Sequence, residues 1–221
     1  MNINCEIFTF NPVEENCCIF WDVNTLDAAI VDCGARTEAE FKKVEQCIDL
    51  RGLHLRMVLQ THTHFDHIYG LPRLYEKYGI GPSCHADDLP IYQAAQQMAS
   101  AFALPIQGNL PPVAEFLNDG QELKLGSIPI RVIHTPGHTP GGICFYLPES
   151  KQLFCGDTLF HESVGRTDLP GGDSQTLLES ISSRLFKLPY ETRVLPGHGD
   201  VTTIGWEASN NPYVYNIDFD D

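Results

Sequence analysis

Basic residues are scarce in this sequence. Fourteen lysines and arginines stand against 29 aspartates and glutamates, so the formal net charge is −15 at pH 7. A field of this sign repels nucleic acids and anionic membrane surfaces, and no run of basic residues interrupts it. We therefore expect neither a nucleic-acid partner nor a membrane partner.

Long apolar runs are missing as well. No stretch approaches the roughly 18 consecutive apolar residues that a membrane-spanning helix needs. Residues 1–6 contain neither a basic region nor an apolar signal core. We expect a cytoplasmic protein. With 221 residues, 43% of them hydrophobic, the chain can bury a layered core, and we expect one domain over residues 1–221.

Two patterns of reactive residues are also lacking. The eight cysteines include no Cys-x-x-Cys pair, and most lie in apolar segments, where a free cysteine packs as a small hydrophobic residue. Cys155 lies two residues before a candidate ligand, so a chemical role is kept open for it beside simple packing. No Gly-x-Ser-x-Gly elbow is present, which argues against a serine nucleophile.

Residues 61–70 hold an unusual density of metal-binding side chains: His62, His64, Asp66 and His67. They follow an apolar run, which predicts a strand that ends in a metal-binding turn. On an extended strand His62 and His64 share one face, whereas Asp66 and His67 follow the turn and point elsewhere. Two pairs aimed in two directions suit two ions about 3.5 to 4 Å apart. The alternative is an ordinary polar surface loop.

Three more candidate ligands occupy predicted junctions between a strand and a loop. They are His138 in Pro-Gly-His, Asp157 in Gly-Asp-Thr and His198 in Pro-Gly-His-Gly. A rigid scaffold usually presents ligands in this way. His85 also ends a predicted strand, and we expect it to cap the following turn rather than to bind metal. Hydrophobic periodicity predicts a helix over residues 37–49 and strands over 5–10, 17–23, 28–32, 122–125, 128–134, 142–147 and 153–156.

This ordered set of motifs resembles the metallo-β-lactamase fold, and its spacing is similar to that of glyoxalase II, the hydroxyacylglutathione hydrolases. The resemblance runs from about residue 5 to residue 212. Residues 163–170 and 202–207 resemble the short single-domain bacterial branch of that group. The resemblance implies an α/β protein with an αββα four-layer sandwich and a site at one edge, where the strand loops converge.

The resemblance also implies a role for each ligand. One metal ion would be held by His62, His64 and His138, a second by Asp66, His67 and His198, and Asp157 would bridge them. Asp66 and Asp157 are expected to be catalytic. Imidazole and carboxylate ligands suit zinc, with iron or manganese as alternatives.

The expected activity is hydrolysis of a small acyl thioester that is glutathione-linked in the family. A water shared by two metal ions loses a proton near neutral pH, because coordination lowers its pKa from about 15.7 toward 7, and the bridging hydroxide attacks the carbonyl carbon. A thiolate then leaves without strong acid assistance. Arg166 matches a basic position that contacts a glutathione carboxylate in the family. It could instead pair with Asp168 or Asp173.

Other families and activities fit this pattern of residues less well. Persulfide dioxygenases share the ligand set and Gly-Arg-Thr-Asp at 165–168, and they hold one iron at positions matching His62, His138 and Asp157. The cysteine that commonly precedes their Gly-Arg pair is Val164 here. A scaffold that only binds metal is disfavoured by the complete ligand set, and RNA processing is disfavoured by the acidic charge.

Overall fold

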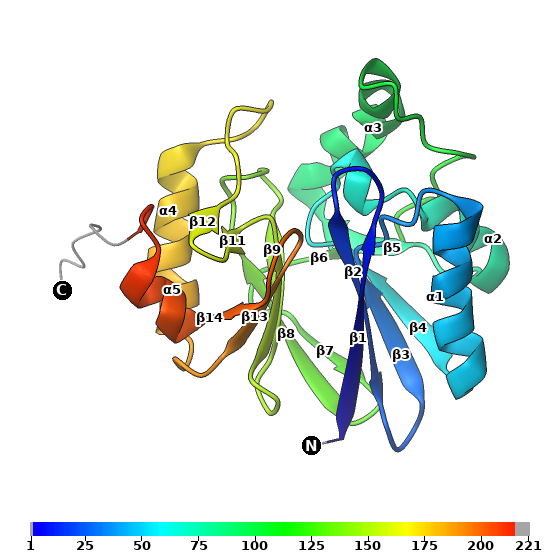
Figure 1. Ribbon diagram of the computed structural model, residues 1–221, viewed down its shortest axis with the longest axis horizontal. Helices are drawn as coiled ribbons and strands as arrows, with labels where there is room; N and C mark the ends of the chain where they lie inside the picture. Colours follow the sequence, from blue (N-terminus) through cyan, green and yellow to red (C-terminus); the bar gives the residue numbers. More distant parts are fainter. Residues whose placement is uncertain (1, 215–221) are drawn as a thin grey trace.

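The computed structural model describes residues 2–214, so both ends of the predicted 1–221 domain lie outside the described residues. Within these residues the chain forms two six-stranded sheets packed face to face, with helices on both outer faces (Figure 1). The predicted αββα four-layer sandwich is confirmed. No helix in the described part of the chain is long and apolar enough to cross a membrane.

The strands of the first sheet, in spatial order, are β1 (Ile3–Phe10), β2 (Glu15–Asp22), β3 (Asp27–Val31), β4 (His54–Leu59), β5 (Pro82–His85) and β6 (Glu115–Leu117). Those of the second sheet are β14 (Thr202–Thr203), β13 (Arg193–Pro196), β10 (Gln152–Gly156), β9 (Ile143–Leu147), β8 (Ile128–His134) and β7 (Glu122–Leu125). A small separate hairpin joins β11 (Leu159–Phe160) and β12 (Ser163–Val164). The helices are α1 (Glu38–Arg51), α2 (Leu71–Tyr78), α3 (Leu89–Ala101), α4 (Ser174–Ser183) and α5 (Ile204–Asn210).

Alternating side chains of one strand explain the layered core. On β2, Ile19 faces the layer formed with α1, α2 and α3, whereas Phe20 points into the space between the two sheets. Successive residues of a strand point to opposite faces, so a central strand of a sandwich must be apolar on both. The ring of Phe20 stacks on that of Phe154 from the second sheet, with centroids 5.1 Å apart. Helices α4 and α5 cover the other side of the second sheet.

Local signals define α1 as predicted. The Thr37 side chain accepts a hydrogen bond from the Glu40 backbone N–H, and the Glu40 carboxylate accepts one from the Thr37 N–H. This capping box satisfies two donors that have no partner within the helix. Gly52 ends the helix in the left-handed conformation, with φ of 62°.

Two parallel strand pairs bring the candidate ligands to one edge. Strand β3 runs parallel to β4 in the first sheet, and β10 runs parallel to β13 in the second. Parallel neighbours end at the same edge of a sheet, and ligand sites form beyond such carboxyl ends. Residues 61–67 follow β4, Asp157 follows β10 directly, and His198 follows β13, so all of them meet at one edge of the sandwich.

Candidate metal centre

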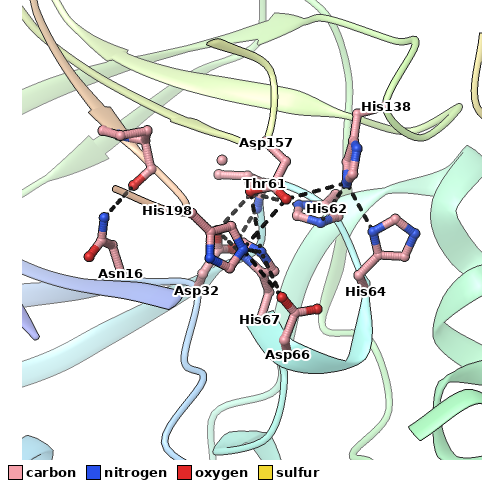
Figure 2. Close-up of polar contacts among 12 residues, drawn as sticks. Asn16, Asp32, Thr61, His62, His64, Asp66, His67, His138, Asp157 and His198 are labelled. Atoms are coloured by element: carbon pink, nitrogen blue, oxygen red, sulfur yellow. Dashed lines mark hydrogen bonds and ion pairs between the residues drawn. The ribbon is translucent and has the colours of Figure 1, made fainter. Parts of the chain in front are cut away.

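The seven predicted ligands lie together, six of them in two groups of three and Asp157 between the groups (Figure 2). In the first, His138 Nε2 lies 2.9 Å from His64 Nδ1 and 3.2 Å from His62 Nε2. In the second, His198 Nε2 lies 3.3 Å from both His67 Nε2 and Asp66 Oδ2. The first group thus offers three ring nitrogens, and the second offers two ring nitrogens and a carboxylate.

Asp157 lies between the two groups. Its Oδ2 is 3.6 Å from His138 Nε2 in the first group and 3.6 Å from His198 Nε2 in the second. Its Oδ1 is 3.4 Å from His67 Nε2, and that buried oxygen has no hydrogen-bond partner among the described residues. A buried carboxylate without a donor needs a positive charge nearby, which two bound cations would supply.

The arrangement fits metal ions. Two nitrogens bound tetrahedrally to one zinc ion lie about 3.3 Å apart, given a Zn–N distance of about 2.05 Å. The imidazole separations of 2.9, 3.2 and 3.3 Å match that spacing. In the first group the ring nitrogens lie closer to one another than to any carboxylate oxygen, and in the second they also face carboxylates. Nitrogen and carboxylate donors without thiolate suit zinc and also iron.

His62 and His64 join the same group, but they do not lie on the strand itself as expected above. Strand β4 ends at Leu59, so the two histidines lie in the loop after it. What fixes them is Thr63 between them, because its backbone N–H donates to Asp88 Oδ2 over 2.9 Å. The backbone at His64 is still extended, with φ −62° and ψ 150°, which keeps the alternation of side chains.

A turn of 3-10 helix aims the second pair. Residues Phe65–His67 form it, and the His67 backbone N–H donates to the His64 carbonyl over 3.1 Å. The change from extended backbone to this turn points Asp66 and His67 toward His198, as predicted. The second group therefore depends on the turn that follows the first.

Contacts on the far side of two rings fix which nitrogen faces the metal positions. The Nδ1 of His138 lies 2.7 Å from the Arg166 carbonyl, and the Nδ1 of His198 lies 2.9 Å from the Val13 carbonyl. A carbonyl only accepts, so each Nδ1 must carry the proton and donate it. This leaves the Nε2 of each ring facing the metal positions, as the nitrogen that can bind an ion once it carries no proton.

Asp32 was missed by the sequence reasoning as a functional residue. Its Oδ2 accepts from His67 Nδ1 over 3.0 Å and from the Thr61 hydroxyl over 2.7 Å. The Thr61 oxygen in turn lies 3.2 Å from His62 Nδ1, so Asp32 orients one ligand of each group. Its other oxygen accepts from the Thr61 N–H, which leaves it a supporting group rather than a ligand. The sequence did contain a signal for Asp32: it directly follows an apolar strand, as Asp157 does.

Asp88 was missed as well. In addition to Thr63, its buried carboxylate accepts from the Gly141 N–H over 2.7 Å and the Thr139 hydroxyl over 3.2 Å. It therefore ties the loop that carries His62 and His64 to the loop that carries His138. Burial raises the pKa of this carboxyl despite those donors. No sequence signal distinguished it, because its partners are 25 and about 50 positions away.

The structure also bears on the predictions made for His85, Cys155 and Arg166. His85 caps the next turn, since its Nδ1 accepts from the Asp87 N–H over 3.3 Å. The Cys155 thiol is buried and lies 3.2 Å from the Leu159 carbonyl, so it packs rather than reaches the site, and burial raises its pKa. The Arg166 guanidinium forms two 2.7 Å contacts with the Asp168 carboxylate.

The metal-binding edge opens into a cavity of about 750 Å³. Residues of helix α3 and of the segment 160–171 both line it. In Figure 1 these two segments rise on the same edge of the sandwich. His64, Asp66, His138, Asp157 and His198 all border the cavity, so a small molecule can reach both ligand groups.

Comparisons with known proteins agree with this geometry. Residues 11–198 match the metallo-beta-lactamase superfamily. The chain is 35% identical over 213 residues to the hydroxyacylglutathione hydrolase GloC of Haemophilus influenzae, covering 96% of this chain and 98% of that protein.

Two solved structures are also similar. The BLEG-1 B3 metallo-beta-lactamase superposes with a TM-score of 0.87 at 31% identity, over 96% of this chain and 99% of that one. TTHA1623 in a di-iron-bound form superposes with a TM-score of 0.84 at 40% identity, over 94% and 99%. With its two ligand groups at the shared edge of the sandwich, this chain belongs to the metallo-beta-lactamase superfamily.

Proposed function

We propose that the protein is a dinuclear metal-dependent thioesterase of the glyoxalase II type. The observation that carries this proposal is the pair of three-ligand groups that share Asp157 at the base of an open cavity. The similarity to a hydroxyacylglutathione hydrolase over nearly the whole of both chains supports the same substrate class. The substrate is a small molecule, and a cytoplasmic location stays a prediction.

One ion would be held by His62, His64 and His138. The other would be held by Asp66, His67 and His198. Asp157 would bind both ions. Two divalent ions bound there would supply Lewis acidity and a water acidic enough to yield hydroxide near neutral pH. Zinc is the expected metal, and iron remains compatible because a similar structure holds two irons.

The protein's own groups then have two tasks. Asp66 and Asp157 would place negative charge beside bound ions, and the Nδ1 donors of His67, His138 and His198 keep their rings from rotating. Rings held in place need no reorganisation during the reaction. The apolar side chains of the cavity exclude bulk water from the substrate and so strengthen electrostatic interactions within it.

The residues that line the cavity indicate which kind of leaving group the site can accommodate. Among the described residues that line it, apart from the predicted metal ligands, the side chains that can ionise are Asp87 and Arg166. Asp87 is exposed, and the guanidinium of Arg166 does not release its proton. Neither is placed to protonate a departing amine. A thiolate departs without that assistance, so a thioester suits this site better than an amide.

Arg166 remains the proposed contact for a substrate carboxylate. Its side chain is 60% exposed, borders the cavity and is held by Asp168. Asp173 instead caps α4, accepting from the Thr176 N–H over 2.7 Å. A guanidinium has five N–H donors, so the bidentate contact with Asp168 leaves others for a substrate.

The experiment is to purify the protein without added metal, measure its metal content, and assay hydrolysis of lactoylglutathione by thiol release with an oxygen electrode in the same cell. We expect two metal ions per chain and thiol release without oxygen uptake. Chelated protein is the control, and adding back the metal should restore its activity. Stoichiometric oxygen uptake with glutathione persulfide and a single bound iron would favour a dioxygenase instead.

A further inference from the structure

Helix α3 has two apolar faces, and the protein core uses one of them. Tyr92 and Ala99 are buried in the layer between α3 and the first sheet. Ile91, Ala94 and Met98 recur at helical spacing and border the cavity instead. A helix that packs on one partner needs one apolar stripe. The second stripe is therefore available for a ligand.

This apolar surface continues to the metal ligands. Phe102 follows α3, borders the cavity and is 56% exposed. Its ring lies 5.5 Å from the ring of Phe65, which stands between His64 and Asp66 in sequence. An apolar strip thus begins beside the ligands of both groups and runs outward along α3. We refer to Phe65, Ile91, Ala94, Met98 and Phe102 as the α3 strip.

Charge is distributed unequally around the cavity. Arg166 is the one lysine or arginine among the described residues that line it, and it belongs to the segment of residues 160–171 rather than to α3. The α3 side contributes Asp87, which would repel a carboxylate. Glutathione carries two carboxylates, so the side chains that line the cavity offer a cation to one of them at most, and they offer apolar surface to the other part of the substrate.

We propose that the substrate is a thioester with an apolar acyl chain of about four to eight carbons, which lies along the α3 strip while the thiol half faces Arg166. This inference rests on the proposed thioesterase function. A lactoyl group is short and carries a hydroxyl, so it leaves most of the strip exposed to water. Each buried methylene should raise kcat/KM about threefold to fourfold.

The test keeps the thiol constant and varies the acyl chain. The kcat/KM values of lactoyl-, butanoyl-, hexanoyl- and octanoylglutathione are compared on the metal-loaded enzyme. We expect a steady rise from butanoyl to octanoyl, with lactoyl below hexanoyl. Equal values, or a preference for lactoyl, would overturn the acyl-chain proposal and leave the thioesterase intact. Failure to hydrolyse any of the four would remove the proposed function itself.

Matched variants place the effect on the α3 strip. Ala94→Phe fills the cavity and should lower kcat/KM for octanoylglutathione at least tenfold, with little change for butanoylglutathione. Gln93→Phe makes the same change at the neighbouring exposed position outside the cavity lining and should leave the series unchanged. Equal responses of the two variants would contradict the proposal. Metal content and melting temperature verify that both are folded.

A binding measurement supplies a readout other than turnover. S-octylglutathione, a thioether that cannot be hydrolysed, should bind the wild type with a negative heat-capacity change, because apolar surface is buried. Met98→Asn, which places an amide on the α3 strip, should weaken this binding about tenfold and leave S-methylglutathione unaffected. Equal losses for the two ligands would show that Met98 only maintains the helix.

Discussion

The two ligand groups share Asp157 but differ in protonation. In the first, burial lowers the pKa of His62 well below its usual value and that of His64 to about 4. In the second, burial opposes the charge on His67 and His198, but the carboxylates of Asp157 and Asp66 outweigh it and raise both pKa values. Without metal, His62 and His64 are therefore neutral, whereas His67 and His198 hold protons beside the carboxylates of Asp66 and Asp157.

The difference shows how a carboxylate within a ligand group changes the binding of protons and of metal ions. His62 and His64 keep their lone pairs available for a metal down to acidic pH, and the first group brings no negative charge of its own. The second must release protons before it binds a cation, although its carboxylate attracts that cation more strongly. Asp157 is the proposed ligand common to both, so it is the residue through which binding at one group would influence the other.

Removing the shared carboxylate should have the largest effect. Asp157→Asn takes one negative charge from both groups, so metal content should fall below one ion per chain and hydrolysis by about a thousandfold or more. Metal analysis after dialysis and initial rates measure this. Asp200→Asn, the same change at an exposed position after His198, should keep both ions. Two retained ions in Asp157→Asn would refute the bridging role.

Removing a ligand of one group should separate the two. Asp66→Ala should lower metal content toward one ion per chain and depress hydrolysis by about two to three orders of magnitude. His64→Ala is the matched change in the first group, and the remaining ion should then reside with Asp66. Two bound metal ions and an unchanged rate of hydrolysis in Asp66→Ala would contradict the dinuclear assignment.

A variant of Asp32 tests whether one supporting residue orients ligands in both groups. Because it orients His67 directly and His62 through Thr61, Asp32→Asn should weaken metal affinity about ten- to a hundredfold at both groups. Asp88→Asn instead loosens the loops around His62, His64 and His138, so it should act mainly on the first group. Competition with a chelator measures both. Identical profiles for the two variants would argue for general destabilisation.

Arg166 should have a smaller effect, and one confined to the substrate. Arg166→Met keeps the backbone carbonyl that accepts from His138, so both groups should keep their metal. The KM of a carboxylate-bearing thioester should rise about tenfold, and that of a neutral one much less, because a hydrogen bond to a charged group is lost. A lower melting temperature with equal losses on both substrates would show that the pair with Asp168 is structural.

The smallest effect concerns pH. Protons compete for His67 and His198, whose pKa values are raised, more than for His62 and His64, whose pKa values are lowered. As pH falls from 8, the second group should therefore lose its ion at a higher pH than the first. Metal release followed by spectroscopy of a cobalt-substituted sample measures the order. Simultaneous release, or the reverse order, would contradict the comparison.

Much of the fold could be predicted because its signals are local. The capping box at Thr37 and Glu40 lies within four residues, and a continuous apolar run marks a central strand such as β2. Strand β6 and the β11–β12 hairpin were not predicted, because runs of two or three residues carry no periodicity. Helix α4 was also missed, although Asp173 is a recognisable cap for its first turn.

The sequence by itself determined which residues are candidates for metal binding, because histidines and aspartates gather in short motifs at the ends of apolar strands. Only the tertiary structure decided what surrounds them. Asp32 and Asp88 act on partners 25 to 53 positions away, and no local pattern encodes that distance. The pairing of parallel strands brings the motifs to one edge, and the packing of α3 leaves its second apolar face toward the cavity. Both depend on long-range contacts that form only when the layers assemble.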